Sequence, residues 1–557
     1  MTPRDPNKLD DWFPTGEDYR IDLPRLGVVV GGSLSKGLVV KLDRQQAIEE
    51  LAVGRYVVVH GANNTRFFCM LTDVVLDSSN PGIQNDPPDI GDPFMRDVYS
   101  GTAAYGVVNV APMLLIGDDE RPKPVKTIPS HFTPVHNASA EDVNAVFGAE
   151  DETHFNVGAP LELEHTNINL DLVRLVERSV GVFGKSGTGK SFLTRVILAG
   201  VISKGQAVNL IFDMHNDYGW EVVTETGYSV KGLKQLFSDR LTILTLDAES
   251  SRRRKAKYDF EVKLGFSEIE PDDIAMLRGT MNLSDTMIDA AFTLRKRWDK
   301  EWIARLLDGR MDDLDDISEN TNIQAGTLFA LQRRLERFER WAFLTPESTG
   351  EDSVQAIINL LVEQQKSVVL EFGRYGNSME AYILVANYLT RRIHAAYVDK
   401  VEKALGDVAM GPPQLLITIE EAHKFLDPQI ARQTIFGTIA RELRKYSVTL
   451  LIVDQRPSGI DDEVMSQIGT RVTALLDNER DINAVLTGIS GAGGLREVLA
   501  RLDTKQQAII MGHAVPMPVV IKTREYDEDF YKAMRNLTPV DVSGVRKSLG
   551  SGGRRRV

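Results

Sequence analysis

The stretch Gly184-Lys185-Ser186-Gly187-Thr188-Gly189-Lys190-Ser191 decides the fold of this chain. It follows the pattern G-x-x-x-x-G-K-S, a loop whose backbone cradles phosphate groups. The apolar run 179–183 precedes it and predicts a short buried strand, and residues 192–200 follow it with the apolar spacing of a helix. Strand, glycine-rich loop and helix are the context that this motif requires. The chain is therefore predicted to bind a nucleoside triphosphate.

The residue types in this loop suit a bound anion. Its glycines let the backbone curl so that several N–H groups point at one ligand, and the following helix adds the partial positive charge of its N-terminus. Lys190 is expected to reach the β- and γ-phosphates, and Ser191 to hold Mg²⁺. The predicted nucleotide contacts are Gly184, Ser186, Gly187, Thr188, Gly189, Lys190, Ser191 and Phe192.

Composition places the chain among globular proteins of more than one domain. It has 557 residues, with 42% hydrophobic and 26% charged, too long for one ordinary core. A single cysteine, Cys69, rules out a disulfide framework within the chain and favours a reducing compartment. We find no apolar run near the length of a membrane span and no secretory leader, so a cytoplasmic protein without a membrane partner is expected. With a net charge of −14, the surface as a whole does not attract nucleic acid, so nucleic-acid binding would depend on local basic surfaces.

The N-terminal part has the texture of a small β-barrel. Short β-branched or aromatic runs lie at 27–32, 38–42, 56–60, 66–71 and 105–110, and turn-forming residues separate them. The apolar residues around Val58 are expected in its core. Residues 77–97 are interpreted as a long loop and 117–160 as a connection. His131, His136 and His154 in that connection match no metal-site spacing and are expected at the surface.

A second apolar strand is predicted at 207–212, and it ends in Asp213. Acidic residues just beyond the carboxyl end of a strand lie on the ligand side of an open parallel sheet. Asp213 could therefore polarise water or support Mg²⁺. A role as the cap of a turn or helix remains open from sequence.

The strand predicted at 414–419 ends in two adjacent carboxylates, Glu420 and Glu421. Glu420 is expected to hold the water shell of the metal, and Glu421 to orient the water that attacks the γ-phosphate. Adjacent glutamates could also be N-terminal charges of a helix. Gln455 follows another buried strand, 447–454, and could sense the γ-phosphate.

Charged helical texture fills residues 249–350, interpreted as a helical insert. It includes the basic run 252–255, for which a solvated segment is favoured over a nucleic-acid contact. The arginines at 554–556 form a basic tip on a C-terminal tail, for which a solvated end is likewise favoured.

Taken together, these motifs resemble the HerA/FtsK-type DNA translocases, HerA in particular. The phosphate loop, D-M-H-N-D-Y at 213–218, I-E-E-A-H at 419–423, and A-R-E-L-R-K-Y-S with D-Q-R-P-S at 440–447 and 454–458 carry the resemblance. It covers roughly residues 25–530. Asp217 stands where the family has Glu. Glu420 stands where many relatives have Asp, which adds a methylene at the metal position.

The resemblance implies an α/β fold: a RecA-like P-loop ATPase core with an extra strand between its two nucleotide motifs, an N-terminal barrel of the HerA–ATP-synthase (HAS) type, and a helical insert. It implies a ring, usually hexameric, that binds double-stranded DNA and hydrolyses ATP with Mg²⁺ between subunits. Arg441, Arg444 and Arg178 are candidates for arginines supplied to a neighbour's site. Family members commonly work with an effector, such as a NurA-like nuclease or a sirtuin-type NADase, in DNA end processing or anti-phage defence.

The expected domains follow from these assignments. They are an N-terminal arm (1–20), a HAS-like barrel (21–155), two parts of the ATPase core (156–250 and 356–535) that flank the helical insert (251–355), and a C-terminal tail (536–557).

Three functions remain open from sequence. The first is an ATP-driven motor that moves double-stranded DNA. The second is a nucleotide-gated ring scaffold that assembles and activates a partner enzyme. The third is a ring ATPase acting on protein chains, for which we identify no aromatic pore loop.

Overall fold

The computed structural model describes residues 25–536, apart from 63, 88–90, 100–101, 118–120, 162, 224–226, 228, 310, 322, 347–351, 405–410, 433, 490–491 and 505. The arm predicted at 1–20 and the basic tip at 554–556 lie outside this range. The chain divides into two compact units. One contains the described parts of Met1–Asp171, Phe183–Gly189 and Thr470–Arg524, and the other those of Leu172–Val182, Lys190–Gly469 and Glu525–Val557.

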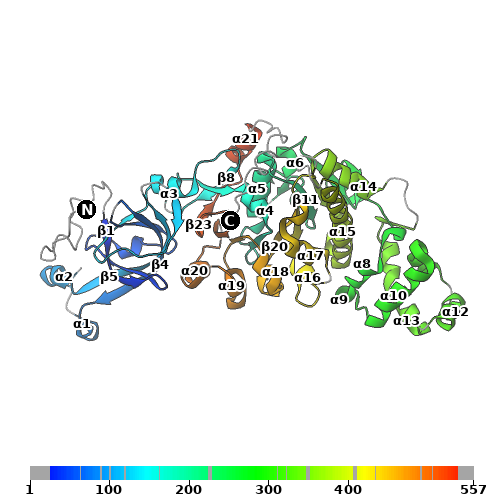
Figure 1. The fold of residues 1–557 in the computed structure, drawn as a ribbon, viewed down its shortest axis with the longest axis horizontal. Coiled ribbons are helices and arrows are strands. Elements are labelled where there is room, and N and C mark those ends of the chain that lie inside the picture. The colour runs from blue at the N-terminus through cyan, green and yellow to red at the C-terminus, as the bar shows by residue number, and fades with distance from the viewer. Residues whose placement is uncertain are drawn as a thin grey trace. The chain divides into compact units, whose positions relative to one another are not determined.

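The first unit contains a sheet that closes on itself. Its strands are β1 (Arg25–Ser33), β2 (Gly37–Leu42), β3 (Tyr56–His60), β4 (Arg66–Ser78), β5 (Ala104–Ile116), β6 (Pro122–Pro124) and β7 (Pro134–Asn137), coloured blue to cyan in Figure 1. They are ordered β2-β1-β7-β3-β4-β5-β6, and β2 also pairs with β5, which closes a ring. Alternate side chains such as Val57, Val59 and Cys69 fill its core. The five predicted runs thus form a closed barrel; that it is of the HAS type stays a prediction.

Two interpretations of the N-terminal part are wrong. Residues 117–160, interpreted as a connection, contain β7, which pairs with both β1 and β3 and is needed for closure. His136 lies on this strand and is only 5% exposed, so it is not a surface histidine. The loop interpreted at 77–97 contains α1 (Pro81–Asn85) and part of α2 (Pro93–Tyr99). Runs this short carry too few apolar positions for a periodicity to be recognised.

The first unit also contains an antiparallel sheet built from distant segments. Its order is β21 (Thr470–Thr473), β22 (Gln507–Gly512), β23 (Val519–Thr523), β8 (His154–Ala159) and β9 (Ile168–Asp171). The backbone N–H of Val520 donates to the hydroxyl of Tyr56 at 3.0 Å, which ties this sheet to the barrel. The unit's helices are α1, α2, α3 (Ala140–Phe147), α19 (Glu479–Leu486) and α20 (Ala492–Ala500).

The second unit is an α/β layer around a parallel sheet. Its strand order is β15 (Phe260–Glu261), β14 (Leu241–Thr245), β18 (Ser367–Glu371), β11 (Val208–Asp213), β19 (Leu415–Glu420), β20 (Val448–Asp454) and β10 (Val180–Phe183). The pairs from β15 to β20 are parallel. Nearly every residue of β11, β19 and β20 is buried, as expected for strands covered on both faces. β20 lies between the strands of the two nucleotide motifs, as predicted.

Helices flank this sheet. α5 (Lys190–Lys204) packs on β11, α17 (Ile435–Glu442) packs on β20, and α15 (Met379–Lys403) packs on α17 (Figure 1). α5 is buried on almost all sides from Leu193 onward, which explains its weak amphipathicity. The remaining helices around the sheet are α4 (Leu172–Glu177), α6 (Leu233–Leu236), α7 (Ala248–Arg253), α14 (Ser353–Ile358), α16 (His423–Leu426), α18 (Asp462–Gln467) and α21 (Glu528–Asn536).

The predicted insert is a helical subdomain coloured green in Figure 1. Its helices are α8 (Pro271–Ala275), α9 (Arg278–Met281), α10 (Asp285–Trp298), α11 (Trp302–Asp308), α12 (Met311–Asn320) and α13 (Ala325–Leu335). α10 packs against α8, α11 and α13. The buried carboxylate of Asp273 on α8 accepts hydrogen bonds from Asn387 and Arg391 of α15, which anchors the insert to the sheet layer. The short pairs β12 (Val222–Val223) with β13 (Ser229–Val230) and β16 (Leu264–Gly265) with β17 (Leu344–Thr345) complete the unit.

Candidate nucleotide site

The phosphate loop connects β10 directly to α5, as the motif predicts. Gly184, Gly187 and Gly189 have φ angles of 154°, 78° and 87°, in the region that side-chain-bearing residues avoid. A Cβ at Gly187 or Gly189 would meet no atom within 4 Å, so backbone conformation rather than space requires glycine there. Thr188 closes the turn by donating from Oγ1 to the carbonyl of Lys185 at 2.8 Å, while Ser186 is exposed.

Lys190 is the first residue of α5, and its ammonium group faces a set of carboxylates. Burial lowers its pKa, and the nearby charges of Glu421, Asp454 and Glu420 oppose that shift. Lys190 and the three carboxylates thus lie in one electrostatic site, although they come from three separate segments. Ser191 follows on the same first turn and is half-buried.

Phe192, a predicted nucleotide contact, is 38% exposed on α5. The guanidinium of Arg195 lies 5.4 Å from the centre of its ring, on the same helix face. No structural observation assigns Phe192 a contact with nucleotide, and that role stays a prediction.

Glu420 ends β19 as a buried carboxylate with one free oxygen. Tyr218 donates to its Oε1 at 2.9 Å, and the Tyr382 hydroxyl accepts from its backbone N–H at 2.9 Å. Oε2 is buried and has no hydrogen-bond partner among the described residues; Nε2 of His215 lies 4.0 Å away. Burial, with the neighbouring Asp213 carboxylate, raises the pKa of Glu420 to about 8.

The unpartnered Oε2 fits the metal position predicted for Glu420. A buried anionic oxygen is costly unless a proton or a cation compensates it. That Ser191, half-buried on the first turn of α5, is a second oxygen ligand stays a prediction. The described residues contain no cluster of three or more acidic, histidine or cysteine ligands. A Mg²⁺ ion held by one carboxylate, one hydroxyl, water and nucleotide phosphates is the arrangement that this sparse set suits.

Glu421 lies just beyond the strand in a left-handed conformation, with φ of 50°. Such a conformation is unfavourable for glutamate and persists only where the surrounding structure holds it. Nε2 of Gln455 lies 3.4 Å from Glu421 Oε1, so the two residues predicted to act on the γ-phosphate lie side by side. The Glu421 side chain keeps 26% exposure, which leaves it accessible to water.

Behind Glu421, His423 and Asp454 form a hydrogen-bonded pair. Asp454, fully buried at the end of β20, accepts from the backbone N–H of His423 at 2.7 Å and lies 3.0 Å from its Nδ1. Nδ1 also lies 3.6 Å from Glu421 Oε2. Asp454 therefore orients the segment that carries Glu421 by linking the ends of β19 and β20.

Asp213 has the geometry of a turn cap, the alternative that the sequence left open. Its two oxygens accept from the backbone N–H groups of Asp217, Tyr218 and Gly219 at 2.7, 2.8 and 3.2 Å. Burial, with the neighbouring Glu371, raises its pKa to about 7. The carboxylate builds the turn that presents Tyr218 to Glu420, and a direct role at the metal stays a prediction.

The three candidate arginines lie apart from these carboxylates or outside the described side chains. Arg178 precedes β10, at the end of the strand opposite to the phosphate loop, and its Nε has no partner among the described residues. Arg441 on α17 donates from Nη2 to the carbonyl of Ala431 at 3.3 Å, and its Nη1 is buried without a described partner. Arg444 lies in the 3₁₀ turn Leu443–Tyr446, and its side chain is outside the described part. Their action on a neighbouring subunit stays a prediction.

Sequence reasoning missed Tyr218, His423 and Asp454 as site residues. All three stand inside motifs that the sequence analysis quoted, directly after or at the end of an apolar strand. That position was the available signal, because the carboxyl ends of parallel strands meet at one edge. Which partner each side chain takes depends on strand order, since Tyr218 and Glu420 are 202 residues apart.

Comparison with known proteins agrees with this geometry. Residues 155–393 match the family model for the central domain of helicase HerA, a segment that contains the phosphate loop, the turn after β11 and the insert. This chain is similar to the HerA helicases. The site described above is that of a P-loop ATPase.

Proteins named HerA are similar to most of the chain. The DNA double-strand break repair helicase HerA of Pyrococcus furiosus is 25% identical over 420 residues, 71% of this chain and 73% of that protein. The HerA of Sulfolobus acidocaldarius is 25% identical over 412 residues, 73% of this chain and 76% of that protein. Among solved structures, the plasmid coupling protein TrwB with a non-hydrolysable ATP analogue has a TM-score of 0.46 and 10% identity, covering 70% of this chain and 94% of that chain.

One negative finding accompanies these matches. Within the part of the chain that the structure describes, no helix combines the length and the apolar character needed to cross a bilayer.

Proposed function

We propose that this HerA-like ATPase is a motor that moves double-stranded DNA. Hydrolysis of ATP, bound together with Mg²⁺, drives the movement. The relatives named above are DNA double-strand break repair helicases, which supports DNA as the substrate. The observation that carries the proposal is the arrangement at the ends of β19 and β20. Glu420 has a free buried oxygen for a metal, and Glu421 is exposed to water and linked to Gln455 at 3.4 Å.

In this arrangement each residue has a separate task. Lys190 binds the β- and γ-phosphates, and Glu420 with Ser191 holds Mg²⁺, which neutralises charge on the phosphates when bound. Glu421 accepts a proton from the attacking water, and Asp454 with His423 fixes the position of that glutamate. Gln455 contacts Glu421 directly, so loss of the γ-phosphate would affect the residues at the ends of both β19 and β20.

The motor is proposed to work as a homohexameric ring. A free Nη1 on the otherwise anchored Arg441 suits an arginine that completes a neighbour's site. Within the ring, the barrel unit would hold a partner effector of the nuclease or NADase type, in DNA end processing or anti-phage defence.

DNA-stimulated ATP hydrolysis tests the proposal. The purified chain is expected to hydrolyse ATP faster when duplex DNA is added at low salt, because phosphate contacts weaken steeply as salt rises. The Lys190→Ala and Glu421→Gln variants should lose this stimulation. Duplex DNA that neither binds nor accelerates turnover at low salt would overturn the motor. Full activation of a co-purified effector by Glu421→Gln would favour the scaffold instead.

A further inference from the structure

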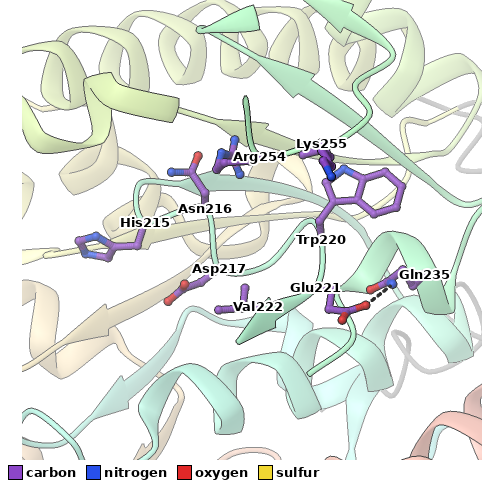
Figure 2. A pocket seen from close by; sticks show the side chains of 10 residues that line it. His215, Asn216, Asp217, Trp220, Glu221, Val222, Gln235, Arg254 and Lys255 are labelled. Carbon is purple, nitrogen blue, oxygen red and sulfur yellow. Dashed lines mark hydrogen bonds between the residues drawn. The ribbon is translucent and has the colours of Figure 1, made fainter. Parts of the chain in front are cut away.

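A cavity of about 540 Å³ lies beside the turn that follows β11 (Figure 2). Its walls come from residues 215–217 and 220–222, from Gln235, and from residues 254–256 after α7. This volume lies within the 300–1,000 Å³ typical of small-molecule sites. The cavity takes in part of the basic run 252–255, which the nucleotide site leaves unused.

The cavity has two chemically different sides. Figure 2 shows Asn216, Arg254, Lys255 and Trp220 along one side, and Asp217, Val222 and Glu221 along the other. One side therefore offers cations and an aromatic ring, and the other offers carboxylates. A ligand that matches both sides carries an anionic group, a flat ring and hydroxyl donors.

Of the two cationic side chains at the cavity, Arg254 and Lys255, only Lys255 is available for a ligand. Arg254 is held by Glu371, whose Oε2 accepts from Nη2 at 2.6 Å. Lys255 is exposed, and its ammonium group forms no hydrogen bond or ion pair with any described residue. Its backbone is left-handed, with φ of 56°, directly after the C-cap of α7. Lys255 is thus the group that an incoming phosphate would meet first.

The opposite side offers an acceptor. The carboxylate of Asp217 forms no hydrogen bond or ion pair with a described side chain, whereas its backbone is fixed by Asp213 and Arg195. Glu221 is engaged by Gln235 at 3.2 Å. Trp220 is held by its indole N–H, which donates to the carbonyl of Lys257 at 2.7 Å, so the ring plane is fixed. Fixed rings are good stacking platforms for bases.

We propose that this cavity is a second nucleotide site, in which Lys255 binds a phosphate, Asp217 binds sugar hydroxyls and Trp220 stacks against the base. Carboxylates that accept from ribose hydroxyls and aromatic rings that stack on bases are general devices of nucleotide recognition. The ligand is a nucleotide unit, supplied either as a free mononucleotide or as part of a strand.

The site is separate from the phosphate loop. The loop follows β10, whereas the cavity's main wall follows β11, and β19 and β20 lie between those strands. The inference goes beyond the proposed motor, since it requires neither DNA movement nor a ring.

A ligand in the cavity would change the position of the Glu420 carboxylate. The turn that forms its wall also carries Tyr218, which donates to Glu420. The same turn is tied to the end of β18 through Asn216, whose Oδ1 accepts from the backbone N–H of Gly373 at 2.9 Å. A ligand that shifts Asn216 or Asp217 therefore shifts the hydroxyl that positions Glu420.

The test is the stoichiometry of ADP binding to the full chain, measured by equilibrium dialysis with Mg²⁺. The unmodified chain is expected to bind a second ADP beyond the one at the phosphate loop. Lys255→Glu and Trp220→Ala should weaken the second binding event about tenfold or more, because each removes one of its main contacts. Lys296→Glu, a charge reversal on the exposed side of α10, is the matched control and should leave both events unchanged.

Two further arms separate the sources of the nucleotide. If AMP competes for the second event, the ligand is a mononucleotide; if only a single-stranded oligonucleotide competes, it is part of a strand. The site would be overturned if the unmodified chain bound a single ADP and the Lys190→Ala protein bound neither AMP nor the oligonucleotide. A second event that survives both Lys255→Glu and Trp220→Ala would also overturn it. Neither result bears on DNA-stimulated hydrolysis, which tests the motor separately.

Discussion

The hydroxyl of Tyr218 donates a 2.9 Å hydrogen bond to Oε1 of Glu420, and both side chains are buried. This contact joins the turn after β11 to the end of β19. It leaves Oε2 as the one side-chain oxygen of Glu420 without a hydrogen-bond partner among the described residues. The geometry of the carboxylate that we propose as a metal ligand therefore depends on a tyrosine from a different motif.

Tyr218→Phe should slow ATP turnover about 10–100-fold while nucleotide binding is retained, because the carboxylate loses the donor that orients it. The free energy of unfolding should fall by about 1–3 kcal/mol, the cost of leaving a buried acceptor unpaired. Steady-state kinetics and chemical denaturation measure the two effects. Tyr397→Phe is the control, since that buried hydroxyl has no partner among the described residues; its loss should leave turnover unchanged and should not lower the free energy of unfolding. Equal effects of the two variants would contradict the positioning role.

Glu421→Gln should reduce hydrolysis about 10²–10⁴-fold, the usual contribution of a general base. Binding of ATP should persist, because the phosphate loop and Lys190 are untouched. Gln455→Ala, which removes the neighbour 3.4 Å from Glu421, should give a smaller loss of the same kind. Single-turnover hydrolysis alongside equilibrium nucleotide binding separates the steps. A Glu421→Gln protein that hydrolyses ATP at the unmodified rate would remove Glu421 from this role.

Asp454→Asn should lower turnover about 10–100-fold although Asp454 is buried behind the reacting groups. Oδ2 of the carboxylate accepts from the backbone N–H of His423 and Oδ1 accepts from the backbone N–H of Arg456, whereas an amide has only one oxygen that can accept. The matched control is Asp461→Asn, where the side chain caps α18 and asparagine caps equally well. Steady-state kinetics of both variants, with thermal melting to check folding, give the comparison. Similar kinetic losses in both would point to a general effect on folding.

The pKa of Glu420, raised to about 8 from an ordinary 4.5, makes stability depend on pH. Between these values the folded protein keeps a proton that the unfolded chain has lost, so the free energy of unfolding falls as pH rises. Glu420→Gln has no such proton. In Mg²⁺-free buffer the variant should therefore gain stability over the unmodified chain as pH rises from about 5 to 8, on the order of a few kcal/mol at most.

Thermal melting across this pH range measures the difference. Adding Mg²⁺ and ADP should narrow it, because a bound cation favours the ionised carboxylate. A difference that does not change with pH would mean that Glu420 is ionised throughout in the folded protein.

Arg441→Ala should reduce ATP hydrolysis about 10³-fold or more if its guanidinium completes a neighbouring subunit's site. Mixing it with Lys190→Ala protein should restore part of the activity, because some subunit pairs then combine an intact phosphate loop with an intact arginine. Each variant alone stays inactive, which provides the control. Failure of the mixture to recover activity would place Arg441 outside the shared site, where its hydrogen bond to Ala431 is only structural.

The local motifs were predictable because their chemistry is carried by neighbouring residues. Gly187 and Gly189 have the positive φ values that the phosphate loop needs, and β20 lies between the strands of the two motifs as predicted. The barrel strands with clear alternation were predictable for the same reason. β7 was not, because its four residues carry a proline and a histidine whose burial comes only from pairing with β1 and β3.

By itself, the sequence determined that the chain builds a phosphate loop, a pair of strand-end carboxylates and a parallel sheet around them. These follow from spacing along the chain, which fixes backbone conformation and the face of each strand. Only the tertiary structure decided that Asp213 caps a turn, that Tyr218 holds Glu420, and that Asp454 supports His423. Those partners are set by strand order and by burial, since residues far apart in sequence meet only where the carboxyl ends of neighbouring strands converge.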